Sequence, residues 1–511
     1  MSLRGDERLA FNAGGARREV ASSAASPSTR ADAARTALPE PAPAARSGRR
    51  RAPADAEPRD WAFTWTMIFT AVLFLRPQDL LPPLELLHLA EMSALAALVA
   101  LIGGRMARRQ PLTRMTPEFA GVLALGALIL LLAPFSIWFG GVVHVFTNVY
   151  VKVALVYLLA VNVIVSPKRL ERLTWILVIA VGYIGFRAVL DYVRGVNVFA
   201  HGTRVMGSVG GLMENPNDLA LHMVVFLPLA LFMAMRPGSA PKRLIAAGAG
   251  FSMIGAVVAS GSRGGFLGLA ATLVVLTVLV ARQRPALVAA GVLVMLCALP
   301  LVPGQYWRRI ASITDDSKDD YESAAARRTL FGEAIDAFLE NPLTGVGAGQ
   351  FKDYKPEKRI EAWHETHNIW LQVSSELGIL GFAIFAFLMG RAFWGVWQTR
   401  RLLAKAALAL ARRRSSTRKA VAGAPIISAY DATLLDAHSA AMAASLVGFF
   451  VCSFFASVAY GWTFYYLLVL AVAPRDMLRA CVPPRTAAIA DRQAELAAPL
   501  VPDLGRGGAH A

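Results

Sequence analysis

Side chains that can move protons stand together in residues 364–382, HETHNIWLQVSSELGILGF, where a polar segment gives way to an apolar one. His364 and His367 carry imidazoles whose ordinary pKa is near neutrality, so either can take a proton from an attacking hydroxyl. Asn368 and Glu376 follow in the same segment. These residue types predict a general base supported by an amide and a carboxylate, although Glu376 can equally hydrogen-bond a neighbouring helix.

Arginines elsewhere in the chain supply a complementary charge. Arg263 stands between small residues in SGSRGGFLG, Arg204 precedes the ENPND of residues 214–218, and Arg327 and Arg328 are adjacent. An arginine at the end of an apolar helix either faces a polar cavity or extends to the membrane interface. Because guanidinium groups match phosphate oxygens, two or three converging arginines would hold a pyrophosphate leaving group beside the histidine.

The composition indicates that membrane helices position these residues. Of 511 residues, 56% are hydrophobic and 17% are charged, whereas soluble proteins carry about 25% charged residues. The net charge of +17 fits basic loops at an anionic membrane surface better than nucleic-acid binding. The three cysteines lack metal-ligand spacing, and the acidic run DDSKDD at 315–320 is typical of solvated charge. We expect neither a metal nor a cofactor.

Twelve apolar runs long enough to cross a bilayer predict an all-α polytopic membrane protein. Residues 1–60 form a polar tail that we expect to be disordered and cytoplasmic. Residues 61–303 hold about nine helices, 304–368 form a large loop, 369–474 hold the last helices around a basic loop at 391–432, and 475–511 form a second cytoplasmic tail. The twelve runs lie at 61–75, 87–104, 117–139, 147–166, 173–190, 219–235, 244–260, 265–281, 286–303, 369–390, 436–457 and 461–474.

The loops between these runs differ strongly in basic residues. If the N-terminus is cytoplasmic, the inner loops hold 21 lysines and arginines, and the short outer loops hold four. Basic residues accumulate in cytoplasmic loops. The asymmetry therefore predicts that the histidines, the arginines and the 304–368 loop lie on the outer side. Within that loop, AAARRTLFGEAIDAFLENP predicts a helix ending before Pro342, either on the membrane surface or over the bundle, and TGVGAGQF predicts a glycine-rich turn.

Four separated segments resemble the O-antigen ligase and Wzy-type polymerase superfamily. They are RVMGSVGGLMENPNDLALHM at 204–223, SGSRGGFLGL at 260–269, NPLTGVGAGQF at 341–351, and His367-Asn368 followed by Gly378-Ile-Leu-Gly381-Phe382. They occur in the order of the family and cover roughly residues 200–390. The segment FLRPQDLLPP near residue 76 is similar, more weakly, to the exosortase-associated O-glycosylation ligase variant.

The resemblance implies a GT-C-like fold and an inverting, metal-independent glycosyltransferase of the bacterial inner membrane. Such enzymes transfer a glycan from an undecaprenyl-pyrophosphate carrier to an acceptor hydroxyl at the periplasmic face. Residue by residue, His367 corresponds to the family's proposed base, and its distance in sequence from Gly378 favours it over His364. Arg263, Arg204 and Arg328 correspond to the arginines expected to bind pyrophosphate, with Arg327 an alternative to Arg328.

The supporting residues expected from the same motifs are Asn368, His364, Glu376, Asn215 and Asn217. The acceptor stays open: lipid A-core for a lipopolysaccharide ligase, a growing glycan for a polysaccharide or exopolysaccharide polymerase, or a protein hydroxyl for an O-oligosaccharyltransferase. A polysaccharide transporter or flippase is the alternative of another class. The sequence lacks the two-fold repeat typical of transporters, and its polar residues gather toward one face rather than the midplane.

Overall fold

The computed structural model describes residues 60–199, 204–207, 213, 215–281, 304–311, 323–355, 365–414 and 425–482, with a few single positions between 285 and 302. The predicted tail at 1–59, the run at 286–303, His364, the acidic run at 315–320 and the tail after 482 fall outside these residues, apart from those single positions.

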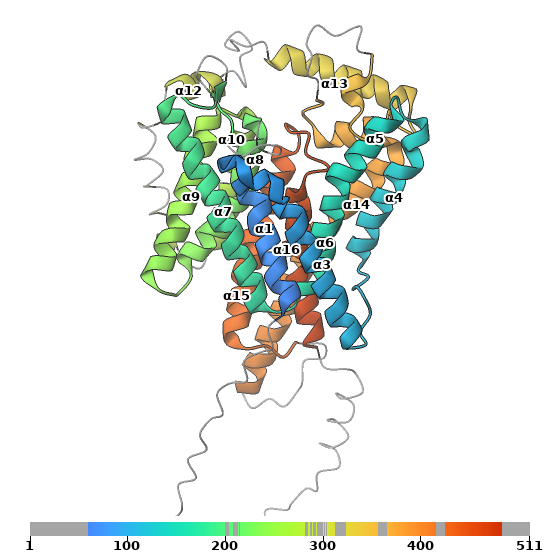
Figure 1. The fold of residues 1–511 in the computed structure, drawn as a ribbon. Helices are drawn as coiled ribbons and strands as arrows, with labels where there is room; N and C mark the ends of the chain where they lie inside the picture. The colour runs from blue at the N-terminus through green and yellow to red at the C-terminus, as the bar shows by residue number, and fades with distance from the viewer. Residues whose placement is uncertain are drawn as a thin grey trace, which may run out of the picture. The chain divides into compact units, whose positions relative to one another are not determined.

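The described chain is built almost entirely of helices joined by short turns (Figure 1). A single antiparallel pair of two-residue strands, β1 (Val198–Phe199) and β2 (Arg204–Val205), interrupts this pattern among the described residues. The first elements are α1 (Trp61–Leu75), α2 (Pro77–Leu80), η1 (Pro82–Leu87), α3 (Leu89–Ala107), α4 (Pro117–Leu132), η2 (Ala133–Phe135), α5 (Phe139–Val145), the π-helical turn η3 (Phe146–Tyr150), α6 (Val151–Val163) and α7 (Pro167–Arg194).

After the strands come the helices that carry most of the motifs. These are α8 (Pro216–Met235), α9 (Ala240–Ser260), α10 (Arg263–Ala281), α12 (Gly304–Ala311), α13 (Ser323–Glu340), η6 (Phe351–Asp353), α14 (Ile369–Arg414), α15 (Ala429–Cys452) and α16 (Trp462–Ala480). The predicted helix before Pro342 is α13, and the glycine-rich turn follows it as predicted.

Nine helical segments of the described chain are long and apolar enough to cross a bilayer. The protein is therefore an all-α polytopic membrane protein. The expected number of twelve membrane helices stays a prediction. The 15-residue α1 is short for a span, and α16 carries Arg475, Asp476 and Arg479. Both nevertheless lie inside the bundle, where the hydroxyls of Thr70 and Tyr466 are 2.8 Å apart.

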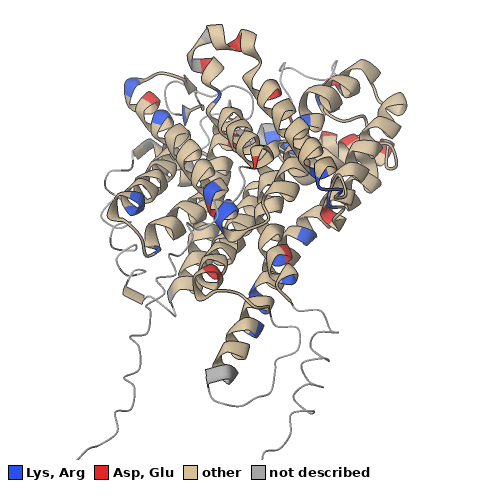
Figure 2. Cartoon of the chain, turned by 60° about the horizontal axis from the view of Figure 1, so that its bottom comes forward, with Lys and Arg blue, Asp and Glu red and all other residues tan. Residues whose placement is uncertain are grey.

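The turns of the bundle gather at its two ends (Figure 1). The strands, the α9–α10 turn, α12, α13 and the start of α14 lie at one end, which we call the α13 end; the tip of α14 and the start of α15 lie at the other. Most positions along the helices are neither Lys, Arg, Asp nor Glu (Figure 2). This distribution follows from the cost of placing charges in hydrocarbon.

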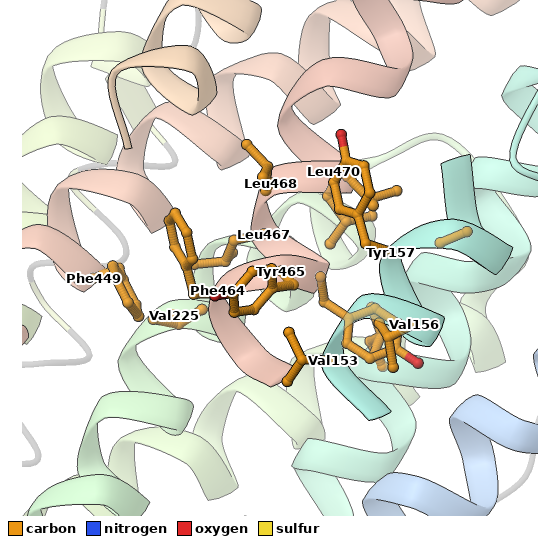
Figure 3. Packing of buried hydrophobic residues seen from close by; sticks show 14 of the residues in the cluster. Val153, Val156, Tyr157, Val225, Phe449, Phe464, Tyr465, Leu467, Leu468 and Leu470 are labelled. Atoms are coloured by element: carbon orange, nitrogen blue, oxygen red, sulfur yellow. The ribbon is translucent and has the colours of Figure 1, made fainter. Parts of the chain in front are cut away.

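The core is centred on α16. Its side chains from Phe464 to Leu470 are buried, and they pack between Phe449 of α15, Val225 of α8 and Tyr157 of α6 (Figure 3). Phe464 stacks on Phe449 with ring centroids 5.4 Å apart. Because α16 is apolar on all sides over this stretch, it is buried in the bundle rather than facing lipid on one side.

Helix α14 spans 46 residues, about 69 Å at 1.5 Å per residue, which is more than twice the ~30 Å of bilayer hydrocarbon. Two features of α14 account for this excess length. Gly378 has φ 64° and ψ −164°, which breaks the helix after its first turns. At the other end, the helix continues to Arg414, whereas the sequence predicted a span ending at residue 390 and a loop from 391. The alanine- and leucine-rich composition after 401 favours this helical extension.

The break changes the role that the sequence indicated for Gly378. In the sequence, Gly378 and Gly381 have a Gly-x-x-Gly spacing, which is typical of glycines that permit close packing of regular helices. Instead, Gly378 adopts a backbone conformation open almost only to glycine, and its Cα lies against the backbone of Leu343, where an added Cβ would come within 2.7 Å. The first turns of α14 can therefore tilt away from the membrane-spanning part and rest on the glycine-rich turn.

Candidate functional site

Arg204 of β2 is fixed by two hydrogen bonds at the α13 end. Its Nε donates to the carbonyl of Ser260 at 3.0 Å, and its Nη2 donates to Oδ1 of Asn217 at 3.0 Å. The side chain is 8% exposed. A guanidinium stays positively charged when it is buried, so Arg204 brings a fixed positive charge to this place.

The SGSRGG segment forms the turn between α9 and α10. Gly261, at φ 57°, ends α9, and the Ser262 hydroxyl accepts a hydrogen bond from Gly265 N–H at the start of α10. The same hydroxyl donates to Asn217 Oδ1 at 2.9 Å. Asn217 thus joins this turn to Arg204, and Arg263, 8% exposed, begins α10 directly beside the junction.

The glycines after Arg263 let α10 begin in a crowded place. A Cβ on Gly264 would come within 2.4 Å of Phe455, and one on Gly265 within 2.5 Å of Ala220. Phe455 belongs to the α15–α16 loop, residues 453–461, and Ala220 belongs to α8. The N-termini of α8 and α10 therefore meet beneath this loop. Asn215 caps α8 by accepting a hydrogen bond from Asn217 N–H, so this predicted site residue shapes the helix start.

His367 precedes a third helix start at the same place. Asn368 caps α14 by accepting hydrogen bonds from the backbone N–H groups of Trp370 and Leu371. The N–H of Ile369 donates to Ser453 O at 2.8 Å, which ties α14 to the α15–α16 loop. His367 itself has φ 46°, a conformation uncommon for a residue with a side chain and concentrated at functional sites.

The pKa of His367 shows which arginines lie near it. Burial, together with the positive charges of Arg327 and Arg204, lowers the pKa of the partly buried His367 to about 4. The imidazole is therefore neutral at pH 7 and can accept a proton. His367 from the α14 segment, Arg204 from β2 and Arg327 from α13 thus face one region, although they are up to 163 positions apart in sequence.

Of the adjacent arginines, Arg327 is the one whose charge acts on His367. Arg327 is partly buried, whereas Arg328 is exposed. On a helix, successive side chains point about 100° apart, so only one of two neighbours can face a given site. The motif in the sequence could not distinguish them, because the rotation of α13 is set by the burial of Leu330, Ala334 and Ala337.

Glu376 fastens the glycine-rich turn to the first segment of α14. Its Oε2 accepts a hydrogen bond from Gly349 N–H at 2.8 Å, and its carbonyl accepts one from Gly347 N–H at 3.0 Å. Gly345 lies against the Glu376 backbone, where an added Cβ would come within 2.3 Å. The side chain of Glu376 thus bonds to a loop rather than to a neighbouring helix, and its role in orienting the site stays a prediction.

Several residues of the site carried no signal in the sequence. Ser457 lies 3.0 Å from the hydroxyl of Thr366, and Gln372 accepts a hydrogen bond from Ala459 N–H at 3.1 Å. Burial and the nearby Glu376 raise the pKa of Tyr460 well above its ordinary value. All of these contacts involve the α15–α16 loop, which has no motif and lies about 90 positions beyond His367. Only its place between two spans could have suggested it.

No group of three or more His, Cys, Asp or Glu side chains suited to a metal ion occurs among the residues that the structure describes. The arrangement instead offers a neutral imidazole, buried guanidinium groups and three helix N-termini. Helix N-termini carry partial positive charge and unpaired N–H groups, which favour phosphate. The region can therefore hold an anion beside a base.

Comparison with known proteins relates part of the chain to one family. Residues 248–386 match the family model described as O-antigen ligase, and a search of curated proteins gave no match. The matched range contains Arg263, Arg327, His367, Glu376 and Gly378, while Arg204 and Asn217 precede it. The resemblance predicted from the motifs is thus confirmed over residues 248–386, and the match supports the O-antigen ligase superfamily for this part of the chain.

Proposed function

We propose that the protein transfers a glycan from an undecaprenyl-pyrophosphate carrier to an acceptor hydroxyl at the periplasmic face of the bacterial inner membrane. The family match supports a glycan-transferring membrane enzyme with lipid-linked glycan and acceptor as partners. The observation that carries the proposal is the neutral His367 imidazole beside Arg204 and Arg327. The excess of basic residues in the loops of the opposite end supports a periplasmic orientation of the site.

In the proposed reaction, the acceptor hydroxyl attacks the anomeric carbon from the side opposite the pyrophosphate. The new glycosidic bond forms as the carbon–oxygen bond to pyrophosphate breaks, which inverts the anomeric centre. His367 takes the hydroxyl proton, and undecaprenyl pyrophosphate leaves with the bonding electrons. A base of this kind contributes roughly 10²–10⁴-fold to the rate.

Arg204, Arg263 and Arg327 would hold the pyrophosphate, helped by the N-termini of α8 and α10. Arg204 is already oriented by Asn217 and Ser260, so little reorganisation is needed when the leaving-group charge develops. The exposed Arg328 stays the alternative from the sequence motif. The reaction as proposed needs no metal ion, because the guanidinium groups supply the positive charge.

Bound pyrophosphate would also change His367. The neighbouring cations disfavour the imidazolium form of His367. Two phosphate groups neutralise those cations, which raises the affinity of His367 for a proton when the acceptor begins to lose one. The base would therefore be strengthened only when the donor is in place.

The test is transfer by the purified full-length chain in phospholipid nanodiscs. The donor is an undecaprenyl-pyrophosphate-linked glycan, and three acceptors are compared: lipid A-core, a glycan and a protein carrying exposed hydroxyls. We expect transfer to one of them by the wild type, followed by a loss of at least 100-fold in His367→Ala and a strong loss in Arg263→Ala. Mass spectrometry of the product identifies the acceptor and the anomeric configuration.

Two matched variants control for indirect effects. His144→Ala removes an exposed histidine from the α5 helix, and Arg194→Ala removes an exposed arginine from the end of α7. Both should transfer at the wild-type rate. Movement of the lipid-linked glycan across the bilayer without transfer to any acceptor would instead favour a flippase and reject the enzyme proposal.

A further inference from the structure

The connection between α4 and α6 exposes large apolar side chains at the α13 end. Phe135, Ile137, Trp138 and Phe139 are 67%, 50%, 58% and 57% exposed. The chain from residue 119 to 151 contains no Asp, Glu, Lys or Arg. Isolated exposed apolar residues are ordinary, but four within five residues form a patch that requires a partner or a lipid environment.

The end of α13 extends this patch. The N–H of Ile137 donates to Val346 O at 3.0 Å, which fixes the α4–α6 connection to the glycine-rich turn. Just before that turn, Leu339 and Leu343 are 67% and 65% exposed. We call Phe135, Ile137, Trp138, Phe139, Leu339 and Leu343 the apolar rim.

The rim is continuous with apolar side chains on the spanning helices. Ile379 of α14 donates its N–H to Pro342 O at 2.9 Å, so Leu343 lies beside the exposed Ile379 and Leu380 of that helix. On α4, Leu130 and Leu131 are 45% and 68% exposed immediately before the connection. Surfaces of this kind on helices that cross a bilayer face lipid. Lipid is therefore the occupant that continuity predicts for the rim.

Distance along α14 gives the depth of the rim. Trp394 and Trp397 are exposed near the other end, and the Arg401 guanidinium lies 5.3 Å from the Trp397 ring centroid. Tryptophan with a nearby arginine is typical of a membrane interface. From Trp397 to Ile379 is 18 residues, or about 27 Å of helix, close to the ~30 Å of hydrocarbon. Ile379 and Leu343 thus lie near the opposite boundary.

We propose that the apolar rim is immersed in the phospholipid leaflet at the α13 end, so that the α4–α6 connection and the end of α13 form a membrane-docked platform rather than a domain projecting into water. The glycine-rich turn between them contacts Glu376, so the platform fixes the candidate site at the level of the lipid headgroups. A donor whose pyrophosphate lies at that level is reached without leaving the membrane.

Spin labels on the full-length chain in phosphatidylethanolamine–phosphatidylglycerol nanodiscs test the platform without using activity. Labels are placed by Trp138→Cys and Leu339→Cys after replacement of the three native cysteines. Asp336→Cys is the matched control, because Asp336 is an exposed polar position on α13, one turn from Leu339. Accessibility to oxygen, which enters lipid, is compared with accessibility to a water-soluble nickel chelate.

We expect the oxygen-to-nickel ratio to be several-fold higher at residues 138 and 339 than at 336. Equal nickel accessibility at all three positions would overturn the proposal and leave the rim for a protein partner. A second measurement uses the otherwise native chain: brominated lipids should quench its tryptophan fluorescence, and Trp138→Phe should reduce the quenched fraction. An unchanged quenched fraction would also contradict immersion of the rim.

Discussion

At the scale of single residues, the cationic neighbours of His367 are the feature with the most direct chemical consequence. They favour the neutral imidazole, which is the form that can act as a base. Each nearby cation also lowers the pH at which the imidazole gains its proton, so removing one arginine should shift the titration of His367. A pH profile can therefore tell which arginines face the site.

For Arg327→Gln, we expect the acid limb of kcat/KM to move to higher pH. The limb of the wild type should lie near pH 4, where His367 of the free enzyme becomes protonated. Removal of a positive charge favours the imidazolium and raises the pKa of His367, while burial still holds the pKa below its ordinary value. Arg328→Gln is the matched control, because the exposed Arg328 should leave the limb in place. A limb that moves with Arg328 and not with Arg327 would reverse the assignment.

At the scale of elements, the break in α14 determines where the candidate base lies. An unbroken helix would carry residues 369–377 along the axis of the spanning part. Gly378 lets these turns tilt, and the backbone contacts of Glu376 hold them on the glycine-rich turn. The α13 helix packs on the same turn through the cluster of Leu330, Val346 and Phe351. The motifs around 341–351 and 367–382 are thus two halves of one supporting structure.

Gly378→Ala should lower the stability of the protein and move His367. The strained backbone costs on the order of 1–3 kcal/mol for a residue with a side chain, and the added methyl group meets the Leu343 backbone. Gly390→Ala on the same helix is the control, because nothing lies within 4 Å of its added Cβ. There the higher helix propensity of alanine favours stability by up to about 1 kcal/mol. Thermal unfolding in detergent should show a lower midpoint for Gly378→Ala alone; equal midpoints would contradict the break as a rigid feature.

At the scale of the whole molecule, a buried ion-pair cluster joins the start of α4, the middle of α14 and the last turns of α16. Glu118 of α4 is fully buried and contacts Arg475 of α16 at 2.7 Å and Arg391 of α14 at 2.6 Å. The same helices carry the apolar rim, the loop at 453–461 and His367 at their other ends. The cluster therefore fixes the relative register of the helices from which the candidate site is assembled.

Glu118→Gln should destabilise the bundle by up to about 3–5 kcal/mol, because the buried Arg475 would keep its charge with only the partly exposed Asp476 carboxylate beside it. Glu85→Gln, which changes an exposed glutamate, should leave the unfolding midpoint unchanged. The double variant Glu118→Met/Arg475→Met should recover much of the loss, since it removes both buried charges. Failure of the double variant to recover stability would mean that packing, rather than the uncompensated charge, caused the loss.

The sequence by itself determined the membrane class, most of the spans, the helix of α13 and the resemblance to O-antigen ligases that the family model confirms over residues 248–386. Each of these depends on local composition or on motifs whose order is preserved along the chain. The length of an apolar run predicts a span because the thickness of the hydrocarbon is fixed. The SRG and HN motifs predict the family because they are short and local in the sequence. The same reasoning could not predict that the helix extends to Arg414, because basic residues at 391–414 are as typical of a cytoplasmic loop as of a helix that leaves the membrane.

Only the tertiary structure decided which residues meet. It brought Arg327 rather than Arg328 to His367, gave Asn217 the role of holding Arg204, and made Gly378 a break in α14 as well as a close contact of the Leu343 backbone. It also added the loop at 453–461, which no motif marks. Spacing in sequence fixes neither the rotation of a helix nor the distance between segments far apart in the chain, because both are set by packing among helices.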